Sequence, residues 1–231
     1  MRILLLEERR QASGWLAKAL RHENYAIDTV HSGEDAIHAL GTEEYDLVLL
    51  EVAVPQEEGL EMIRRLRARG TAVPVIILAA NDTLSGRISG LDAGADDYVT
   101  KPFDMAELTA RIRVQLRRAH FHKNPIVHCG DLMLDSNSRQ FFLGEVPLAL
   151  TPREQSVLEA LIFRAGVTVR KSSLAMSVFG YEDEAHPNAI EIYVHRVRKK
   201  LAGSDVGIVT RRGVGYVLKG ASSRLYQSAA V

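Results

Sequence analysis

The sequence lacks the features that mark secreted, membrane-spanning and disulfide-stabilised proteins. Its 231 residues include one cysteine, Cys129, which excludes a disulfide within the chain and is typical of a reducing compartment. No apolar run approaches the roughly 18 residues of a membrane span, and the four apolar residues of Ile3–Leu6 are too few for the core of a signal peptide. We therefore expect a cytoplasmic protein that has no membrane partner.

Neither sign of charge dominates the chain, because 29 Lys and Arg balance 29 Asp and Glu. The balance hides a difference between the two halves. Residues 1–119 hold 15 basic against 19 acidic side chains, whereas residues 120–231 hold 14 against 10. An acidic half followed by a basic half suggests that only the second half meets a polyanion. The length suits two domains of ordinary size or one large one. A content of 25% charged and 46% hydrophobic residues is typical of a soluble globular protein.

Residues 1–119 alternate short apolar runs with amphipathic helical patterns. The predicted strands are Ile3–Leu6, Ala26–Val30, the run Leu47–Leu50 that ends at Glu51, Val73–Ala80 and Tyr98–Thr100. The predicted helices are one that ends near His22, Gly59–Arg69, Leu84–Ala93, and two that begin at the N-caps Ser32 and Asp104. The inward face of the first helix should consist of Ala12, Trp15, Leu16, Ala19 and Leu20. This (βα)5 pattern predicts an α/β domain with a doubly wound parallel sheet.

Acidic residues follow the first and third predicted strands. In the strand order 2-1-3-4-5 these two strands are neighbours, so Glu7, Glu8 and Glu51 should converge at the carboxyl edge of the sheet. Lys101 follows the fifth strand and should reach the same edge. Pro102 fixes the turn that aims Lys101, and a cis peptide bond is one way to do so.

Residues 1–119 resemble the receiver domain of response regulators. The resemblance rests on the acid pair Glu7–Glu8, the carboxylate after strand three, and the segment Gly90–Phe103 (GLDAGADDYVTKPF) with its Lys-Pro pair. It implies that a histidine kinase phosphorylates an aspartate after strand three, that the acid pair holds Mg²⁺, and that a hydroxyl residue and the lysine read the phosphate. The residues that depart from this pattern are Glu51 for the aspartate, Ala79 for the hydroxyl residue, Glu8 for a metal-binding aspartate, and Arg9 where an acid is common.

Each departure weakens the phosphorylation chemistry. A glutamate carries its carboxylate about 1.5 Å farther out, in-line phosphoryl transfer needs finer placement than that, and Ala79 has no hydroxyl. We therefore expect no resident cofactor, and a Mg²⁺ site at Glu7, Glu8 and Glu51 that is weak or absent. Three hypotheses remain for Glu51: a fixed charge that imitates the phosphorylated state, paired with Lys101 or Arg9; a relic; or a residue that still accepts phosphate or another modification. We favour the first, although a substitution introduced by design would leave the same pattern.

The surface that receivers of the OmpR/PhoB branch use for dimerisation is better preserved. The resemblance implies a homodimer through helix four, strand five and helix five, with Tyr98 as the switch aromatic. The implied ion pairs are Arg87 with Glu107, Asp97 with Arg111, and Asp96 with Arg118. An ordinary charged helix face with an i,i+4 Glu107–Arg111 pair would explain part of this pattern. We expect the dimer to form without phosphorylation, because the interface residues are kept although Glu51 replaces the phosphoacceptor aspartate.

The second half begins after a polar, basic stretch, Arg117–Pro125, within which we place a linker at 120–125. Short β-like runs over Ile126–Leu150 predict a small antiparallel sheet. The predicted elements that follow are a helix from the capping box Thr151–Glu154, a helix Ser172–Val178, a helix Asn188–Leu201, and a hairpin over Ile208–Leu218 with a basic tip whose glycines serve a tight turn.

The helix Asn188–Leu201 separates apolar from cationic residues. Its apolar face consists of Ile190, Val194, Val197 and Leu201, and its opposite face of Asn188, Ile192, His195, Arg196 and Lys199, with Arg198 and Lys200 at the sides. Such a helix is about 21 Å long and fits a major groove about 12 Å wide. Glu191 is its one acidic residue, whereas a solvated helix would normally carry more compensating acids.

Residues 126–220 resemble the winged-helix effector domain of OmpR/PhoB regulators, with QseB- and PmrA-type members the most alike. The resemblance rests on LTPRE at Leu150–Glu154, AIEIYVHRVRKKL at Ala189–Leu201 and RRGVGYVL at Arg211–Leu218. It implies that Asn188, Ile192 and Arg196 read bases. The phosphate contacts that it implies are His195, Arg198, Lys199, Arg153 and Lys171. Arg212 fits a minor-groove contact of the wing, while Arg211 stands where the family usually has an apolar residue.

Together these observations predict a sequence-specific DNA-binding transcriptional regulator that binds repeated half-sites on double-stranded DNA as a homodimer. RNA polymerase is a candidate partner, and the sequence leaves open whether a histidine kinase acts on the protein. The alternative is a signalling adaptor whose receiver binds a kinase or another protein and whose DNA-binding domain is vestigial. We do not expect an enzyme, because the sequence contains no recognisable nucleophile–base pair or cofactor-binding loop. Residues 221–231 are predicted to be a loose tail.

Overall fold

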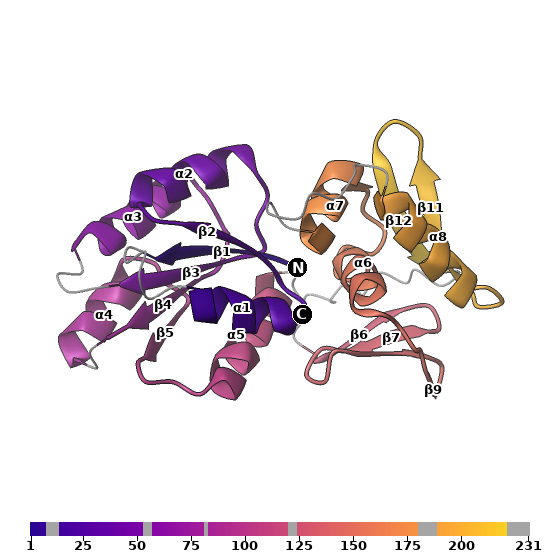
Figure 1. The fold of residues 1–231 in the computed structure, drawn as a ribbon, viewed down its shortest axis with the longest axis horizontal. Helices are drawn as coiled ribbons and strands as arrows, with labels where there is room; N and C mark the ends of the chain where they lie inside the picture. Colours follow the sequence, from indigo (N-terminus) through magenta and orange to yellow (C-terminus); the bar gives the residue numbers. More distant parts are fainter. Residues whose placement is uncertain (8–13, 53–56, 81–82, 120–123, 180–188, 221–231) are drawn as a thin grey trace, which may run out of the picture. The chain divides into compact units, whose positions relative to one another are not determined.

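The computed structural model describes residues 1–7, 14–52, 57–80, 83–119, 124–179 and 189–220. The chain forms two compact units, which are described one at a time. The elements of the first unit are β1 (Arg2–Glu7), α1 (Gly14–His22), β2 (Ala26–Val30), α2 (Gly33–Thr42), β3 (Leu47–Val52), α3 (Glu57–Ala68), β4 (Val75–Ala79), α4 (Leu84–Asp92), β5 (Asp97–Thr100) and α5 (Met105–Ala119) (Figure 1).

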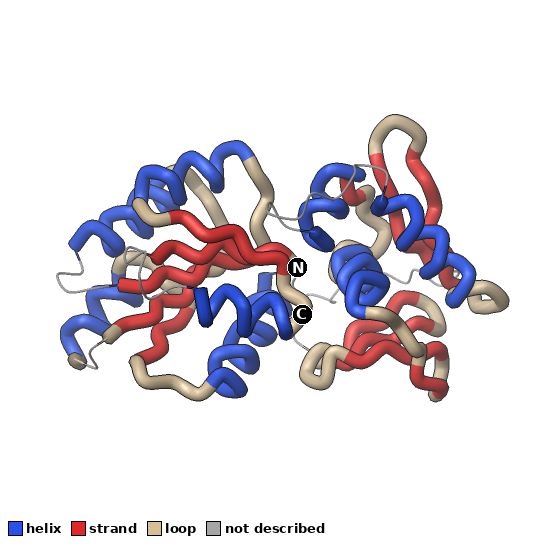
Figure 2. Tube along the Cα trace, viewed as in Figure 1, coloured by secondary structure: helices blue, strands red, loops and turns tan. Residues whose placement is uncertain are grey.

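The first unit is the predicted doubly wound α/β domain. Its parallel sheet has the order β2-β1-β3-β4-β5, which confirms the predicted strand order. The apolar runs that predicted β1 and β3 are fully buried because helices cover both faces of the sheet. Helices α2 and α3 lie on one face, and α1 and α5 on the other (Figures 1 and 2). Ser32 caps α2 by accepting a hydrogen bond from the backbone amide of Asp35 (3.1 Å), as the sequence predicts.

One prediction for this unit is wrong in detail. Trp15 does not pack inward: it is 49% exposed and its ring lies 6.1 Å from that of Phe103. The buried stripe of α1 consists of Leu16, Ala17 and Leu20, and Ala12 lies outside the described residues. Helix α5 continues through Ala119, so the first residues of the basic stretch Arg117–Pro125 belong to this helix, which ends directly before the linker placed at 120–125. Arg117 in its last turn suits the negative end of the helix dipole.

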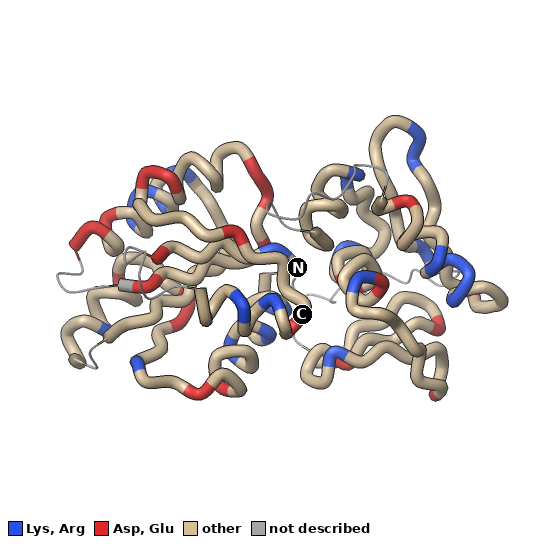
Figure 3. The backbone as a smooth tube through the Cα atoms, in the orientation of Figure 1, with Lys and Arg blue, Asp and Glu red and all other residues tan. Residues whose placement is uncertain are grey.

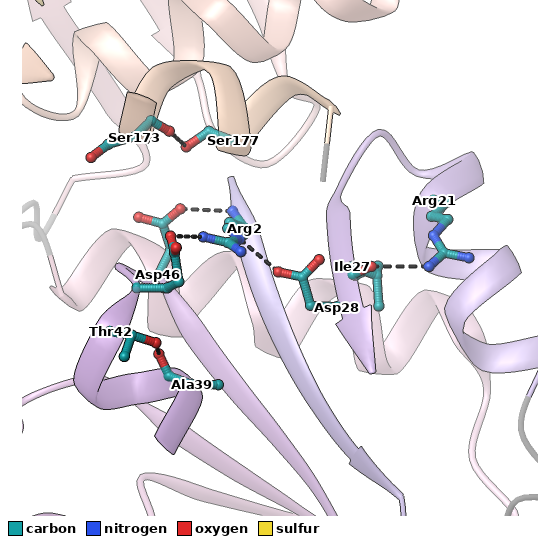
Figure 4. Close-up of polar contacts among 10 residues, drawn as sticks. Arg2, Arg21, Ile27, Asp28, Ala39, Thr42, Asp46, Ser173 and Ser177 are labelled. Atoms are coloured by element: carbon teal, nitrogen blue, oxygen red, sulfur yellow. Dashed lines mark hydrogen bonds and ion pairs between the residues drawn. The ribbon is translucent and has the colours of Figure 1, made fainter. Parts of the chain in front are cut away.

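A charged cluster lies at the amino-terminal edge of the sheet, opposite the edge where Glu51 lies. The Arg2 side chain is buried (2% exposed), and its Nε donates to Asp28 Oδ2 at 2.6 Å and its Nη1 to Glu43 Oε2 at 2.9 Å. The backbone amide of Arg2 donates to Asp46 Oδ2 at 2.8 Å (Figure 4). The guanidinium also stacks on Tyr45, 4.4 Å from the ring centroid. This cluster ties the start of β1 to β2 and to the segment before β3.

The second unit consists of two antiparallel sheets and a set of helices. Its elements are β6 (Ile126–Cys129), β7 (Leu132–Asp135), β8 (Gln140–Leu143), β9 (Val146–Pro147), α6 (Pro152–Ile162), β10 (Val169–Arg170), α7 (Lys171–Phe179), α8 (Ala189–Lys200), β11 (Val206–Arg211) and β12 (Gly215–Gly220). Strands β6 to β9 form one sheet in chain order, and β10, β12 and β11 form the other. A small sheet, three helices and a terminal hairpin match the predicted winged-helix pattern.

The two glycines near the tip of the hairpin have different roles. Gly213 has a φ of 73° and serves the turn, as predicted. Gly215 instead allows a close approach of strands, because a Cβ at this position would lie 1.9 Å from the carbonyl oxygen of Val169 in β10. The pairing of β10 with β12 therefore requires glycine at position 215.

Candidate functional site

The parallel register of β1 and β3 places Glu7 beside Glu51 at the carboxyl edge of the sheet. Glu7 is buried, whereas the Glu51 side chain is 19% exposed and forms an ion pair with Lys101. The Lys101–Pro102 peptide bond is cis, and the backbone amide of Lys101 donates to the carbonyl of Ala79 at 2.8 Å. Lys101 is thus the partner of Glu51 in the structure, while Arg9, the other candidate, lies outside the described residues.

Of the three residues predicted for a Mg²⁺ site, the structure describes Glu7 and Glu51. The ammonium group of Lys101 already neutralises the Glu51 carboxylate, and Glu8 lies outside the described residues. Among the residues that the structure does describe, no three His, Cys, Asp or Glu side chains gather in a way that could hold a metal ion. Ala79 ends β4 as a fully buried residue without a hydroxyl. What the structure shows at this edge is an ion pair between Glu51 and Lys101.

The predicted switch aromatic, Tyr98, lies inside the domain. It is 8% exposed, and a Cβ on Gly90 of α4 would lie 3.3 Å from its Cδ2 atom and 2.7 Å from Ile77 Cδ1. Helix α4 therefore packs closely onto Tyr98 because position 90 has no side chain. Any change in the rotamer of Tyr98 has to move α4 as well.

Four of the six residues predicted to pair across a dimer have partners within one chain. Arg111 of α5 binds Asp97 (3.1 Å) and Glu107 (2.8 Å), and these hydrogen bonds to Glu107 and Asp97 raise its pKa. Asp96 binds Arg67 of α3 at 2.8 Å. Arg87 and Arg118 are exposed on α4 and α5. The Glu107–Arg111 pair is thus also the i,i+4 pair of an ordinary helix face, which the sequence left as an alternative.

Helix α4 exposes an apolar stripe beside these charges. Leu84, Ile88 and Leu91 are 75%, 49% and 45% exposed. Their spacing of four and three residues puts them on one face of the helix. Adjacent exposed leucine and isoleucine side chains on a helix mark a surface that another protein can cover.

In the second unit, helix α8 buries its predicted apolar face. Ile190, Val194, Val197 and Leu201 are each at most 2% exposed. Ile192, His195, Arg196 and Lys199 form an exposed stripe on the opposite face, and Asn188 lies outside the described residues. Figure 3 shows basic residues along the carboxyl-terminal half of α8 and at the tip of the β11–β12 hairpin, where Arg211 and Arg212 are exposed.

One flank of α8 is tied to α6. Lys200 donates to Glu154 Oε2 at 2.7 Å and to the carbonyl of Ala149 at 2.6 Å. Tyr193 lies between two arginines, since its hydroxyl is 3.5 Å from Arg153 Nη1 and its ring centroid is 5.6 Å from the guanidinium carbon of Arg196. Lys200 therefore positions the helix instead of joining the exposed stripe. Tyr193, which the sequence reading missed, orders two of the predicted DNA contacts.

The other flank of α8 is tied to α7 and to the hairpin. Glu191 binds Lys171 at 2.6 Å, a hydrogen bond that raises the pKa of the lysine. Arg198 donates to the carbonyl of Ile208 and to the hydroxyl of Thr210. Lys171 and Arg198, both predicted phosphate contacts, thus also have partners within the protein. The sequence identifies Glu191 as the single acidic residue of this helix, but it does not predict that Lys171 is its partner.

Replacing Glu154 with glutamine should destabilise the second unit. The Glu154 side chain is 3% exposed. Burial raises the pKa of this carboxyl, but hydrogen bonds from Lys200 and Thr151 lower the pKa by more, so the net shift is downward. A depressed carboxyl pKa stabilises the fold above the ordinary pKa of glutamate, and this contribution is lost as the pH falls through the folded-state value. Glu154→Gln should therefore lower the free energy of unfolding by about 1–3 kcal/mol near pH 7. Urea titrations should show this difference shrinking as the pH falls below about 4. A difference that stays constant with pH would contradict this role of the charge.

Comparison with known proteins agrees with this architecture. Residues 3–113 match the response regulator receiver domain, and residues 144–218 match the family described as transcriptional regulatory protein, C terminal. The transcriptional regulatory protein TctD of Salmonella typhimurium is 45% identical over 95% of this chain and 97% of its own length. BasR of Escherichia coli is 37% identical over 94% of this chain and 97% of its own. The solved response regulator DrrB of Thermotoga maritima, an OmpR/PhoB homologue, is 28% identical over 95% of this chain and 99% of its own, with a TM-score of 0.45.

A receiver fold followed by a transcriptional regulatory C-terminal domain defines a two-domain response regulator. The chain belongs to the OmpR/PhoB family of response regulators, which are transcriptional regulators of two-component systems that bind DNA through this second domain. None of the helices in the described residues is both long and apolar enough to cross a membrane.

Proposed function

We propose that this regulator acts as a phosphorylation-independent dimer that binds repeated half-sites on DNA in the cytoplasm. The observation that carries the proposal is the ion pair between Glu51 and Lys101 at the acceptor position. In the family pattern the lysine reads the phosphate. Here a carboxylate supplied by the chain itself provides the negative charge that the lysine binds, so no kinase, Mg²⁺ or other cofactor is required.

The first unit offers a surface for the dimer. The apolar stripe of Leu84, Ile88 and Leu91 on α4 would be covered by the second receiver. The charged residues around it set the register of the two copies more than their affinity, because exposed ion pairs contribute only about 0–1 kcal/mol each. Asp96, Asp97, Glu107 and Arg111 can exchange their partners within the chain for partners in the second copy. Arg87 and Arg118, which are exposed, can pair with acidic residues of that copy.

The second unit offers the DNA-reading surface. Ile192 and Arg196 would contact base edges from the exposed stripe of α8, and His195 and Lys199 would contact phosphates. Arg212 would enter the minor groove from the hairpin. The protein then acts through binding rather than catalysis, with RNA polymerase as a candidate partner on DNA. A signalling adaptor with a vestigial effector domain is disfavoured, because an adaptor has no need of an exposed basic stripe on α8.

Light scattering on the untreated full-length protein tests the proposed assembly. We expect the mass of a dimer across low to high micromolar concentrations without any phosphodonor, because the Glu51 charge is permanent. A parallel measurement with a small-molecule phosphodonor and Mg²⁺ should give the same mass. A monomer that dimerises only with the phosphodonor would overturn the proposal.

Two substitutions on α8 should separate base reading from phosphate binding. Arg196→Ala should weaken binding to the preferred DNA sequence by about 1–3 kcal/mol and relax sequence preference. Lys199→Ala should weaken binding evenly on all sequences and reduce the slope of log affinity against log salt by about 1. Fluorescence anisotropy with preferred and scrambled duplexes at several salt concentrations measures both effects. Equal losses on the two duplexes for Arg196→Ala would rule out its base-reading role.

A further inference from the structure

Arg198 links helix α8 to both strands of the β11–β12 hairpin. Its Nε donates to the carbonyl oxygen of Ile208 at 2.9 Å, and its Nη2 donates to the hydroxyl of Thr210 at 2.6 Å. The guanidinium carbon also lies 5.9 Å from the ring centroid of Tyr216, which pairs with Thr210 across the hairpin. Arg198 is half-buried between these groups, so its guanidinium is held at three points.

The link lies just before the basic tip of the hairpin. Thr210 is followed directly by Arg211 and Arg212, and the chain turns back at Gly213. On the helix, Arg198 is two residues from Arg196. Arg198 therefore joins the part of the protein that would read the major groove to the part that would enter the minor groove.

We propose that Arg198 is a positioning residue that sets the geometry between α8 and the hairpin, so that Arg196 and Arg212 can engage the DNA together. This inference rests on the DNA-reading function proposed above. It requires the planar fork of arginine, because a lysine has one ammonium group and cannot hold the Ile208 carbonyl and the Thr210 hydroxyl in the same fixed geometry. A direct phosphate contact would require only the charge.

Variants that keep every charge on the protein distinguish these two roles. Arg198→Lys retains the charge but loses the fork, and Thr210→Val removes the hydroxyl acceptor while keeping the shape and strand preference of the side chain. Thr210→Ser is the matched control, because it retains the hydroxyl. Each is made in the full-length protein, with and without Arg212→Ala, and thermal unfolding identifies any variant that fails to fold.

The probe is the duplex that the wild-type protein selects from a random DNA pool. Arg212→Ala should reduce affinity for this duplex about tenfold in the wild-type and Thr210→Ser proteins, and less than about twofold in the Arg198→Lys and Thr210→Val proteins. The salt slope should fall by about 1 in Thr210→Val even though no charge is removed.

The outcomes separate this inference from the proposed function. The positioning role would be overturned if Arg212→Ala reduced the affinity for the duplex by the same factor in all four proteins. It would also be overturned if Thr210→Val left the salt slope unchanged. A wild-type protein that selects no sequence from the pool would instead overturn the proposed DNA-reading function, on which the inference depends.

Discussion

Replacing Arg2 with methionine should lower the free energy of unfolding of the receiver domain by about 3–5 kcal/mol. The guanidinium is buried against Asp28, 2.6 Å away, whose side chain is 8% exposed. Methionine fills similar space but leaves the Asp28 carboxylate without its cation in a place that water barely reaches. Burial lowers the pKa of Arg2, but contacts with Glu43 and Asp28 raise it more, so the net shift is upward.

The single tryptophan makes this measurement specific to one domain. Trp15 lies in α1, so its fluorescence during urea unfolding reports on the receiver domain alone. The matched control is Arg64→Met, because Arg64 forms an exposed pair with Glu61 at 3.6 Å, with side chains 53% and 60% exposed. This control should cost less than about 1 kcal/mol.

A second variant checks the mechanism of the Arg2 effect. Adding Asp28→Asn to Arg2→Met should recover part of the lost stability, because the neutral amide is cheaper to leave buried than a carboxylate. If Arg2→Met costs no more than Arg64→Met, the cluster shown in Figure 4 does not stabilise the domain as argued.

The sequence predicts the sheet well but not this cluster. Continuous apolar runs such as Leu47–Leu50 indicate strands buried on both faces, and the order considered for them is one of the common doubly wound orders. Arg2 looks like an ordinary surface residue at the start of a strand. Its partners Asp28 and Glu43 are 26 and 41 residues away in the chain, so only the folded sheet brings them together.

The DNA-facing helix shows the same limit. Its apolar face follows from the 3.6-residue period, and the structure confirms all four predicted core positions. The period cannot separate Lys199 from Lys200, which are adjacent and chemically identical. Lys200 is drawn to Glu154, 46 residues earlier, whereas Lys199 is exposed. Which cations stay available for DNA is therefore decided by contacts between elements.

Neutralising the acceptor position should break the built-in assembly. Glu51→Gln keeps the shape of the side chain but removes the charge that binds Lys101. If that charge holds the dimer-competent state, the dimer dissociation constant should rise by about 5–150-fold, the range of a typical coupling free energy between two sites. Lys101→Met should have a similar effect, because it removes the other half of the ion pair.

Sedimentation of the full-length variants over a concentration series measures the dissociation constant, with Glu61→Gln as a control that removes one exposed carboxylate from α3. The control should dimerise like the wild type, because Glu61 pairs with Arg64 and not with Lys101. A Glu51→Gln protein that also dimerises like the wild type would make Glu51 a relic, and the apolar stripe on α4 would then suffice for assembly. A loss confined to Glu51→Gln and Lys101→Met would instead place control of the dimer in this ion pair. Because the pair is permanent, the amount of protein bound to DNA would then follow its concentration in the cell rather than a phosphorylation signal.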